Sequence, residues 1–453
     1  MALDPKVFKA YDVRGIHPFE LDETGAYAIG RAYVEQFEPN RIAVGHDMRE
    51  SSPGMAEAVM KGATDGGAEI KNIGLIGTEM LYFGVGDLDL DGGVMITASH
   101  NPKEYTGMKI VRRGALPVGG DSGLLDIRDR ALALTESPRP SPADAEVVDI
   151  YPAFVDRVLS FVKVEDIGPL HVVVDAGNGM AGAMLPPILD RLPVDALRCF
   201  FEPDGSFPNH EPNPLLPENR EFIVGKVKDE HADLGLAFDG DADRCFFVDD
   251  TGDFVPGDFV TALLAESMLE KEAGAKIIYD VRASWAVRDT VERLGGTALV
   301  NRVGHAFIKE RMRKEGALFA GEVSGHYYFR DFNQADSGTI PALLMLELVS
   351  KRGQPLSEIL RPLRERYFLT GEINTPVPDV ALKLQELKEH FAGQGEISHL
   401  DGISVTAEDW HMNVRPSNTE PLLRLNLEGL DRELMERKRD EALAVIRGEG
   451  LVS

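Results

Sequence analysis

"GGVMITASHNP", Gly92 to Pro102, is an apolar run that leads directly into a polar turn, and the pattern recurs along the chain. It is repeated in "RIAVGHD" (41–47), "LHVVVDAGNG" (170–179), "ADLGLAFDGD" (232–241) and "AKIIYDVR" (275–282). Short apolar runs of this kind are typical of strands buried on both faces, and helical patterns such as residues 51–67 separate them. The repetition predicts α/β layering.

The chain of 453 residues is too long for one ordinary hydrophobic core, so several domains are expected. The polar, proline-bearing stretch 135–146 is typical of a linker, and further breaks come near residues 247–258 and after residues 363–379. Beyond the last break, the pattern predicts strands between a helix at 379–392 and a final helix at 431–448, which is an α+β arrangement. We therefore predict four domains, residues 1–148, 149–252, 253–367 and 368–453.

Acidic residues dominate the charge, because 75 Asp and Glu outnumber 48 Lys and Arg and the formal net charge is −27 at pH 7. A field of that sign repels nucleic acids and anionic membranes, so neither is expected as a partner. It also repels phosphorylated metabolites, so a phosphate site would need its own group of cations. Two cysteines, the lack of a long uncharged apolar run and the lack of a secretory leader pattern predict a cytoplasmic protein.

The opening stretch places Ser99 beside His100 at the end of a predicted strand. A hydrolase would use such a pair to form an acyl-enzyme, whereas a transferase would use the serine to carry a phosphoryl group. The G-x-S-x-G nucleophile elbow is absent around Ser99. Other motifs have to decide between the two chemistries.

Three aspartates, Asp239, Asp241 and Asp243, alternate in "AFDGDADRC" after an apolar run. If the segment stays extended, its period of two directs all three carboxylates to one side, where they could bind a hard cation. An EF-hand loop begins similarly, but Arg244 and Asp250 stand where that loop requires glycine and glutamate. The pattern favours magnesium in phosphoryl transfer over calcium sensing, with a solvated acidic turn as the alternative.

Two further stretches carry groups that suit a sugar phosphate. "RPSNTEPLLR" (415–424) combines arginine, hydroxyl and amide groups that could hold a phosphate dianion, although a plain surface turn uses the same residue types. "GEVSGHYYF" (321–329) offers Glu322 and Ser324 for sugar hydroxyls and His326 for proton transfer near neutral pH. A loop with an ordinary hydrogen-bonded histidine is the alternative for the second stretch.

A glycine motif points to a different class of protein. Gly177, Gly179 and Gly182 have G-x-G-x-x-G spacing after a predicted strand, and Glu202 follows roughly twenty residues later, as in NAD-dependent oxidoreductases. We favour the simpler interpretation that these glycines turn a strand tightly into a helix.

Five motifs together resemble the α-D-phosphohexomutase family, and within it the bacterial phosphomannomutase/phosphoglucomutase group. They are "AYDVRG" (10–15), "TASHNP" (97–102), "DGDADR" (239–244), "GEVSGH" (321–326) and "RPSNTEP" (415–421). The motifs occur in the family's order, and the resemblance covers essentially the whole chain. It implies three topologically related α/β domains and a C-terminal α+β domain like the TATA-binding protein, arranged around a central cleft.

The resemblance also implies roles for individual residues. Ser99 would carry the phosphate and, with Asp239, Asp241 and Asp243, bind Mg²⁺. The transfer site would further include Tyr11, Arg14, His100, Lys109 and Arg244. Sugar and phosphate binding would fall to Arg282, His305, Glu322, Ser324, His326, Arg415, Ser417, Asn418, Thr419 and Arg424.

In the implied reaction, the phosphoserine donates to one end of a hexose monophosphate, of mannose and/or glucose. The hexose 1,6-bisphosphate formed turns over and returns its other phosphate, with glucose 1,6-bisphosphate as activator. His100, Lys109 or His326 would transfer the proton. Phosphoglucosamine mutase is the nearest rival, but its motifs carry glutamine and glycine where Val323 and Asn418 stand. We expect hexose phosphates as partners and a monomer or small homo-oligomer.

Overall fold

The computed structural model describes residues 3–134, 143–417 and 421–448, and the chain divides into two compact units. The first unit comprises Met1–Phe254 and Gly325–Leu356, and the second comprises Val255–Ser324 and Ser357–Ser453. Most of the predicted linker, residues 135–142, lies outside the described ranges. Among the described residues, no helix is both long and apolar enough to span a bilayer.

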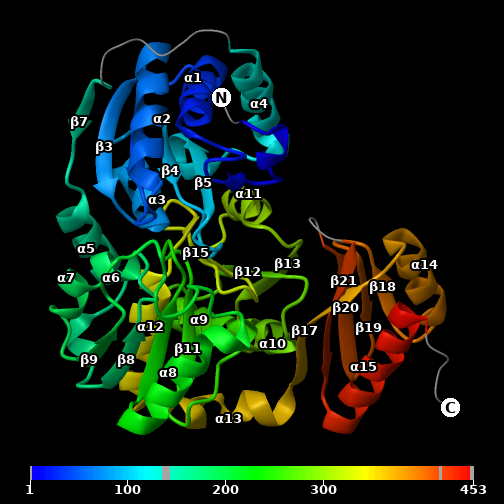
Figure 1. The fold of residues 1–453 in the computed structure, drawn as a ribbon. Coiled ribbons are helices and arrows are strands. Elements are labelled where there is room, and N and C mark those ends of the chain that lie inside the picture. Colours follow the sequence, from blue (N-terminus) through cyan, green and yellow to red (C-terminus); the bar gives the residue numbers. More distant parts are fainter. Residues whose placement is uncertain (1–2, 135–142, 418–420, 449–453) are drawn as a thin grey trace. The chain divides into compact units, whose positions relative to one another are not determined.

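The first unit begins with a mixed sheet of strand order β1-β5-β4-β2-β3-β7, and β6 pairs with β5. The strands are β1 (Val13–Ile16), β2 (Arg41–His46), β3 (Glu69–Leu75), β4 (Gly92–Ile96), β5 (Tyr105–Arg112), β6 (Leu116–Pro117) and β7 (Ala145–Val147). The helices are α1 (Glu23–Phe37), α2 (Ser52–Gly66), α3 (Thr78–Asp87) and α4 (Leu124–Ala133). Helices α1 and α2 lie side by side (Figure 1). Strand β2 runs parallel to β4, so their carboxyl ends meet at one edge of the sheet.

Local sequence explains these elements. Strand β4 is buried at every position, as expected for a strand covered on both faces. The side chain of Asp22 caps α1 by accepting a hydrogen bond of 2.8 Å from Gly25 N. Helix α2 is capped at its carboxyl end by Gly67, whose φ of 102° is a conformation that residues with side chains rarely adopt.

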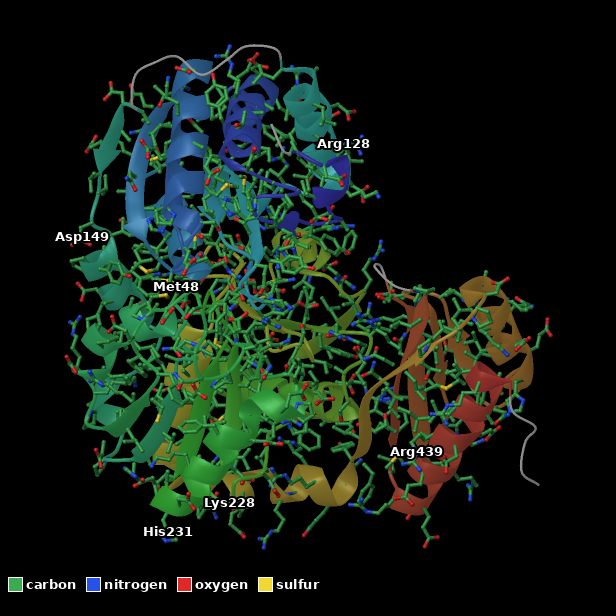
Figure 2. The ribbon with its side chains drawn as sticks, viewed as in Figure 1. Met48, Arg128, Asp149, Lys228, His231 and Arg439 are labelled. Atoms are coloured by element: carbon green, nitrogen blue, oxygen red, sulfur yellow. The ribbon has the colours of Figure 1, made fainter. Side chains whose placement is uncertain are left out.

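A second sheet of order β11-β10-β8-β9 follows in the first unit. Its strands are β8 (His171–Asp175), β9 (Asp195–Cys199), β10 (Leu234–Phe238) and β11 (Cys245–Asp249). Its helices are α5 (Tyr151–Leu159), α6 (Ala181–Met184), α7 (Pro186–Leu189) and α8 (Pro217–Glu230). Figure 2 shows Lys228 and His231 at the outer end of α8, where His231 adopts a left-handed conformation as the helix ends. The hairpin β15 (Tyr327–Phe329) and β16 (Ala335–Asp336) and helix α12 (Thr339–Arg352) complete the unit.

The second unit contains three parallel strands in the order β13-β12-β14 and an antiparallel sheet of order β17-β21-β20-β19-β18. The parallel strands are β12 (Lys276–Asp280), β13 (Thr297–Asn301) and β14 (Phe319–Gly321). Their helices are α9 (Gly257–Lys271), α10 (Trp285–Arg293), α11 (His305–Glu315) and α13 (Leu356–Arg366). The antiparallel strands are β17 (Phe368–Pro376), β18 (Glu396–Ser398), β19 (Ile403–Thr406), β20 (Trp410–Pro416) and β21 (Leu422–Gly429).

Helices α14 (Val380–His390) and α15 (Arg432–Arg447) form one hydrophobic core with the antiparallel sheet. This arrangement confirms the α+β prediction for the end of the chain. The predicted strands of the α/β part are also confirmed as β2, β4, β8, β10 and β12, and each ends before its polar turn.

The glycine motif is used for close packing of the chain on itself. A side chain at Gly179 would bring its Cβ to 2.7 Å from the Gly240 carbonyl oxygen, and one at Gly182 would meet the Phe201 carbonyl oxygen at 2.1 Å. The helix that follows, α6, has only four residues, too short for the helix that binds a dinucleotide pyrophosphate. The structure therefore favours the packing interpretation over the oxidoreductase.

Candidate active site

Ser99 lies just beyond β4 in an unfavourable backbone conformation. Its φ of 49° is in the left-handed region, which costs energy for a residue with a side chain. Its backbone N–H donates to Thr97 Oγ1 over 2.9 Å, and the residue is buried. Such a conformation persists only where neighbouring groups hold it.

Arg49, which lies just beyond the end of the neighbouring strand β2, holds this turn. Its guanidinium donates hydrogen bonds to the carbonyl oxygens of Ser99 (2.8 Å), Asn101 (2.6 Å), Pro102 (2.8 Å) and Tyr105 (3.2 Å). The contact follows from topology, because β2 and β4 are parallel neighbours and the residues beyond their carboxyl ends meet. The sequence carries no signal for this role, since "GHDMRE" (45–50) does not distinguish a bracing arginine from a surface one.

Arg14, on β1, contacts the same turn. Its Nη1 donates to the Ala98 carbonyl oxygen over 2.7 Å and to Asn101 Oδ1, and its Nη2 pairs with Asp12. The predicted basic residue of the transfer site therefore lies against the serine turn.

The three aspartates converge, but by a different route from the one predicted. Residues 239–244 form a turn after β10, with Ala242 at a φ of 59°, so the expectation of an extended segment is wrong. The turn brings one carboxylate oxygen each of Asp239, Asp241 and Asp243 within 4.8 Å of the others, and all three residues are buried.

The chemistry of this cluster fits a metal ion. Among the described residues, Asp241 Oδ1 and Asp243 Oδ1 are buried without a hydrogen-bond partner. Their Oδ2 atoms accept hydrogen bonds from Lys109 Nζ, at 2.8 Å for Asp241. Buried carboxylate oxygens without a hydrogen-bond donor are costly, and oxygen-only donor sets suit hard divalent cations.

Burial and Lys109 determine the protonation of the cluster. Burial raises the pKa of Asp239 to about 8. Burial alone would also raise the pKa of Asp241, but the charge and hydrogen bond of Lys109 hold it below its usual range. The same carboxylates outweigh the burial of Lys109 and raise its pKa well above the ordinary value. Lys109 therefore presents a fixed positive charge.

Ser99 Oγ lies between the cluster and His100. It donates to Asp239 Oδ2 over 3.1 Å and lies 3.2 Å from His100 Nδ1. Arg244 contacts the same two groups, with Nη2 at 2.5 Å from His100 Nδ1 and Nε donating to Asp239 Oδ2 over 2.8 Å. Burial, reinforced by the charges of Arg244 and Arg14, lowers the pKa of His100 well below its usual range. His100 is thus a weak base, which argues against activation of Ser99 as in a hydrolase triad.

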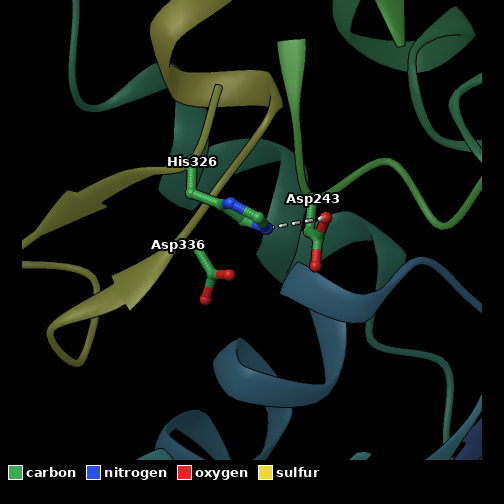
Figure 3. Close-up of side chains that lie close together, drawn as sticks. All are labelled: Asp243, His326 and Asp336. Atoms are coloured by element: carbon green, nitrogen blue, oxygen red, sulfur yellow. Dashed lines mark ion pairs between the residues drawn. The ribbon is translucent and has the colours of Figure 1, made fainter. Parts of the chain in front are cut away.

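His326 reaches the cluster from the β15–β16 hairpin (Figure 3). Its Nε2 lies 3.8 Å from Asp243 Oδ1. Asp336, on β16, joins them in a group whose donor atoms lie within 4.8 Å of one another. The sequence assigns no role to Asp336, because the turn between the two strands separates it from the motif of His326.

The first turn of α3 supports both the aspartate turn and the segment that follows β16. The backbone N–H of Thr78 donates to the Asp241 carbonyl oxygen over 3.0 Å, and Thr78 Oγ1 donates to Asp241 Oδ2 over 2.5 Å. Glu79, which is fully buried, accepts hydrogen bonds from the hydroxyls of Ser337 and Thr339. Neither Thr78 nor Glu79 belongs to a motif, so only the tertiary structure identifies them.

In the second unit, Arg282 lies just beyond β12 in a two-point ion pair with Asp280. Its Nε donates to Oδ1 over 2.9 Å and its Nη2 to Oδ2 over 2.8 Å. Nearby in the sequence, Gly304 N donates to Glu322 Oε1 over 3.1 Å, and His305 is the first residue of α11. The start of α11 and the loop of Glu322 are therefore joined directly.

Arginines also gather on the antiparallel sheet of the second unit. Arg415 on β20 lies directly opposite Arg424 on β21. Glu372, on β17, accepts a hydrogen bond of 3.0 Å from Arg424 Nη1 and lies 3.8 Å from Arg415 Nη2. Its Oε2 also lies 3.4 Å from Arg282 Nη1, and Arg424 Nη2 lies 3.4 Å from Ser417 Oγ. The sequence motif contains both arginines of the sheet but not Glu372.

The predicted site residues divide between the two units. The first unit contains Tyr11, Arg14, Ser99, His100, Lys109, Asp239, Asp241, Asp243, Arg244 and His326. The second unit contains Arg282, His305, Glu322, Ser324, Arg415, Ser417 and Arg424. Asn418 and Thr419 lie outside the described residues. Tyr11 is half-buried in the turn before β1.

Four family models match the chain in order. They describe phosphoglucomutase/phosphomannomutase alpha/beta/alpha domain I (residues 5–135), domain II (152–252), domain III (256–367) and the C-terminal domain (372–445). These matches confirm the predicted fold class of three α/β domains and a distinct C-terminal domain.

Individual proteins match over nearly the whole chain. A phosphohexose mutase of Xanthomonas campestris pv. campestris is 45% identical over 444 residues, covering 97% of this chain and 99% of the relative. A phosphomannomutase of Escherichia coli K12 is 43% identical over 452 residues, covering 97% and 98%. The crystal structure of a phosphoglucomutase/phosphomannomutase family protein from Burkholderia thailandensis has a TM-score of 0.88 at 31% identity and covers 98% of each chain.

Proposed function

The chain belongs to the phosphoglucomutase/phosphomannomutase family, and on that premise we propose that it is a phosphohexomutase in which Ser99 carries the transferred phosphoryl group. It interconverts hexose 1-phosphate and hexose 6-phosphate. The observation that carries the proposal is the contact of 3.1 Å between Ser99 Oγ and Asp239, in a cluster of carboxylates bordered by cations.

In the proposed reaction, the bond between Ser99 Oγ and phosphorus breaks while a hydroxyl oxygen of the bound hexose phosphate bonds to the same phosphorus. The proton of that hydroxyl passes to a base. The hexose 1,6-bisphosphate formed then reorients and returns its other phosphate to Ser99 by the reverse steps. Arg14, Arg244 and Lys109 neutralise charge on the moving group, which is the main task of a protein in phosphoryl transfer.

We propose Mg²⁺ as the ion of the aspartate cluster, held by Asp239, Asp241 and Asp243 together with an oxygen of the phosphate on Ser99. When bound, it supplies electrostatic stabilisation of the transferred phosphoryl group. Thr78 keeps Asp241 in a fixed orientation through its two hydrogen bonds, and Arg244 does the same for Asp239.

We assign the proton transfer to His326 in preference to His100 and Lys109. The low pKa of His100 makes it a weak base, and the contacts of Lys109 with the carboxylates keep it protonated. His326 Nε2 lies at the edge of the cluster, 3.8 Å from Asp243 Oδ1. This position supports a histidine that exchanges protons with a ligand hydroxyl.

The second unit is proposed to recognise the sugar and the phosphate that is not being transferred. Glu322 and Ser324 would bind hydroxyls that glucose and mannose share, so both sugars are expected as substrates. The second phosphate would be held by Arg282, His305, Arg415, Ser417, Asn418, Thr419 and Arg424. Glucose 1,6-bisphosphate would activate the enzyme by phosphorylating Ser99. We also propose a cytoplasmic monomer or small homo-oligomer.

Peptide mass spectrometry of the protein before and after incubation with glucose 1,6-bisphosphate tests the role of Ser99. We expect phosphate on Ser99, and we expect Ser99→Ala to lower mutase activity by about 10³-fold or more, because the acceptor oxygen is lost. Ser160→Ala, at an exposed serine that ends α5, is the control and should retain activity. Wild-type protein that stays unphosphorylated and inactive would contradict the proposal.

Substrate choice is tested by coupled rates with mannose 1-phosphate, glucose 1-phosphate and glucosamine 1-phosphate. We expect the first two to react, because Glu322 and Ser324 are expected to read hydroxyls that both sugars have. A clear preference for glucosamine 1-phosphate would instead assign the chain to the phosphoglucosamine mutase activity.

A further inference from the structure

Two arginines form a cross-strand pair on the antiparallel sheet, so neither has an acidic residue directly opposite it in that pair. Arg415 and Arg424 occupy directly opposite positions of β20 and β21. Like charges in such a pair repel and destabilise a sheet. The acidic group that touches both is Glu372, at 3.0 Å from Arg424 and 3.8 Å from Arg415.

A local irregularity of β17 fixes the position of Glu372. The pairing of β17 with β21 shifts register between Leu369 and Glu372, and Gly371 within the shift has a φ of 68°. After the shift, Glu372 lies opposite Asn426, while Asn374 lies opposite Arg424. Glu372 and Arg424 are therefore diagonal neighbours on the same face of the sheet.

Glu372 does not accept hydrogen bonds from all the N–H groups of these arginines. Among the described residues, Arg415 Nε and Arg424 Nε are buried and have no hydrogen-bond partner. Arg282 Nη1 also reaches Glu372, at 3.4 Å, while its other donors are engaged by Asp280. Asp280 pairs with Arg282, and Glu372 contacts all three guanidinium groups, while the two Nε–H groups of Arg415 and Arg424 remain for a further anion.

We propose that Glu372 is an internal counter-anion, which holds these arginines together in the ligand-free enzyme and competes with the ligand's phosphate for them. The inference rests on the proposed function, because it takes Arg415 and Arg424 as phosphate-binding residues. Glu372 is a positioning residue that acts through the arginines. It keeps them assembled and at the same time limits how tightly they hold a dianion.

Limited phosphate affinity suits a reaction whose bisphosphate intermediate has to be released and bound again in the opposite orientation. Binding that is equally strong in every state lowers KM without raising kcat, and excessive binding slows the turnover of the bisphosphate. A carboxylate among the arginines weakens phosphate binding through charge repulsion. Because the three guanidinium groups still outnumber the carboxylates of Glu372 and Asp280, the site continues to favour a phosphate.

The test is calorimetric binding of inorganic phosphate and of glucose 1,6-bisphosphate to the full chain carrying Ser99→Ala, which prevents phosphoryl transfer to Ser99. Adding Glu372→Gln should tighten binding of both ligands by about tenfold, because one negative charge is removed about 4 Å from the arginines. In the enzyme with Ser99 intact, Glu372→Gln should lower both KM and kcat. The control is Glu386→Gln, which removes one negative charge from α14 at a carboxylate paired with Lys383, and it should leave binding unchanged.

Unchanged or weaker binding in Glu372→Gln would overturn the inference, since a purely structural role predicts loss and never gain of affinity. If Glu372→Gln does not fold, Glu372→Asp tests the inference instead. Aspartate is one methylene shorter than glutamate, so its carboxylate lies farther from the arginines. Binding about threefold tighter supports competition, and wild-type or weaker binding overturns it. A separate result would contradict the proposed function: phosphate binding that stays unchanged in Arg415→Met and in Arg424→Met. This outcome does not depend on the result for Glu372→Gln.

Discussion

At the residue scale, Arg49 shows how one side chain can support a reactive turn. Its guanidinium satisfies four carbonyl oxygens that follow β4, and its Nε lies 3.4 Å from Asp47 Oδ2. A planar fork with five N–H donors can do this, whereas the single ammonium of lysine cannot reach the same set of acceptors. These hydrogen bonds act on the turn in which Ser99 adopts its left-handed conformation.

We therefore predict that Arg49→Lys destabilises the protein by about 3 kcal/mol, because one or two of these buried or partly buried carbonyl oxygens lose their partner. Urea unfolding of the full chain measures the loss. The same variant should slow phosphorylation of Ser99 by glucose 1,6-bisphosphate about tenfold or more, since the serine turn is no longer held.

The control for Arg49 is Lys61→Met, which removes another buried cation of the same sheet domain, paired with Asp65 on α2. It should lower stability but leave the rate of Ser99 phosphorylation close to that of wild type. If both variants phosphorylate Ser99 equally fast, Arg49 contributes to stability alone.

At the element scale, the first turn of α3 connects two segments that the sequence does not relate. Thr78 binds the aspartate turn, and Glu79 binds the start of α12. Burial raises the pKa of Glu79 to about 8, although the two hydroxyl donors oppose the shift. Keeping this carboxylate charged inside the protein costs free energy, so the contact between α3 and the start of α12 is sensitive to pH.

The sign of the pH effect follows from proton linkage. Between about pH 5 and about pH 8, folded Glu79 holds a proton that the unfolded chain has released, so the free energy of unfolding falls as pH rises through this range. Glu79→Gln should remove this part of the pH dependence, which amounts to as much as ~3 kcal/mol. Unfolding of both proteins in urea at several pH values measures it.

Glu57→Gln, at an exposed carboxylate of α2, is the matched control and should follow the wild-type pH profile. Parallel profiles for wild type and Glu79→Gln would show that Glu79 is ionised in the folded protein throughout this range.

The aspartate turn shows where a local pattern misleads at this scale. Period-two alternation directs side chains to one face only while the backbone remains in a paired strand. The pairing of β10 with β8 reaches Ala237, and a turn begins soon afterwards. The residues and their chemistry are predicted correctly from the sequence, but the geometry that gathers the carboxylates comes from the turn, Thr78 and Lys109.

At the scale of the whole molecule, the division into two compact units separates the proposed transfer site from the proposed sugar and phosphate site. The first unit contains the aspartate cluster, and the second contains the arginine group around Glu372. A net charge of −27 makes these local groups of cations necessary for any phosphorylated ligand. The domain boundaries at residues 148, 252 and 367 stay predictions.

We predict that Mg²⁺ stabilises the first unit selectively. An ion that binds only the folded state, at a hundred times its dissociation constant, adds about 3 kcal/mol to the free energy of unfolding. Differential scanning calorimetry with Mg²⁺ and with EDTA should show one thermal transition moving with the metal. Asp241→Asn should abolish the shift, whereas Asp253→Asn, beyond β11 in the same unit, should retain it. A shift that survives Asp241→Asn would place the ion elsewhere.

By itself, the sequence determined the class of fold and the chemical groups of the site. Apolar runs that enter polar turns specify α/β layers, and short motifs contain the serine, the aspartates and the arginines, because both properties depend on residues close together in the chain. Tertiary structure decided which residues hold those groups in place. Arg49 is 50 positions from Ser99 and Glu79 is 260 from Thr339, and parallel strand order and helix packing bring each pair into contact. Glu372 meets Arg424 only because a register shift in β17 sets their pairing, and no local pattern encodes such distant partners.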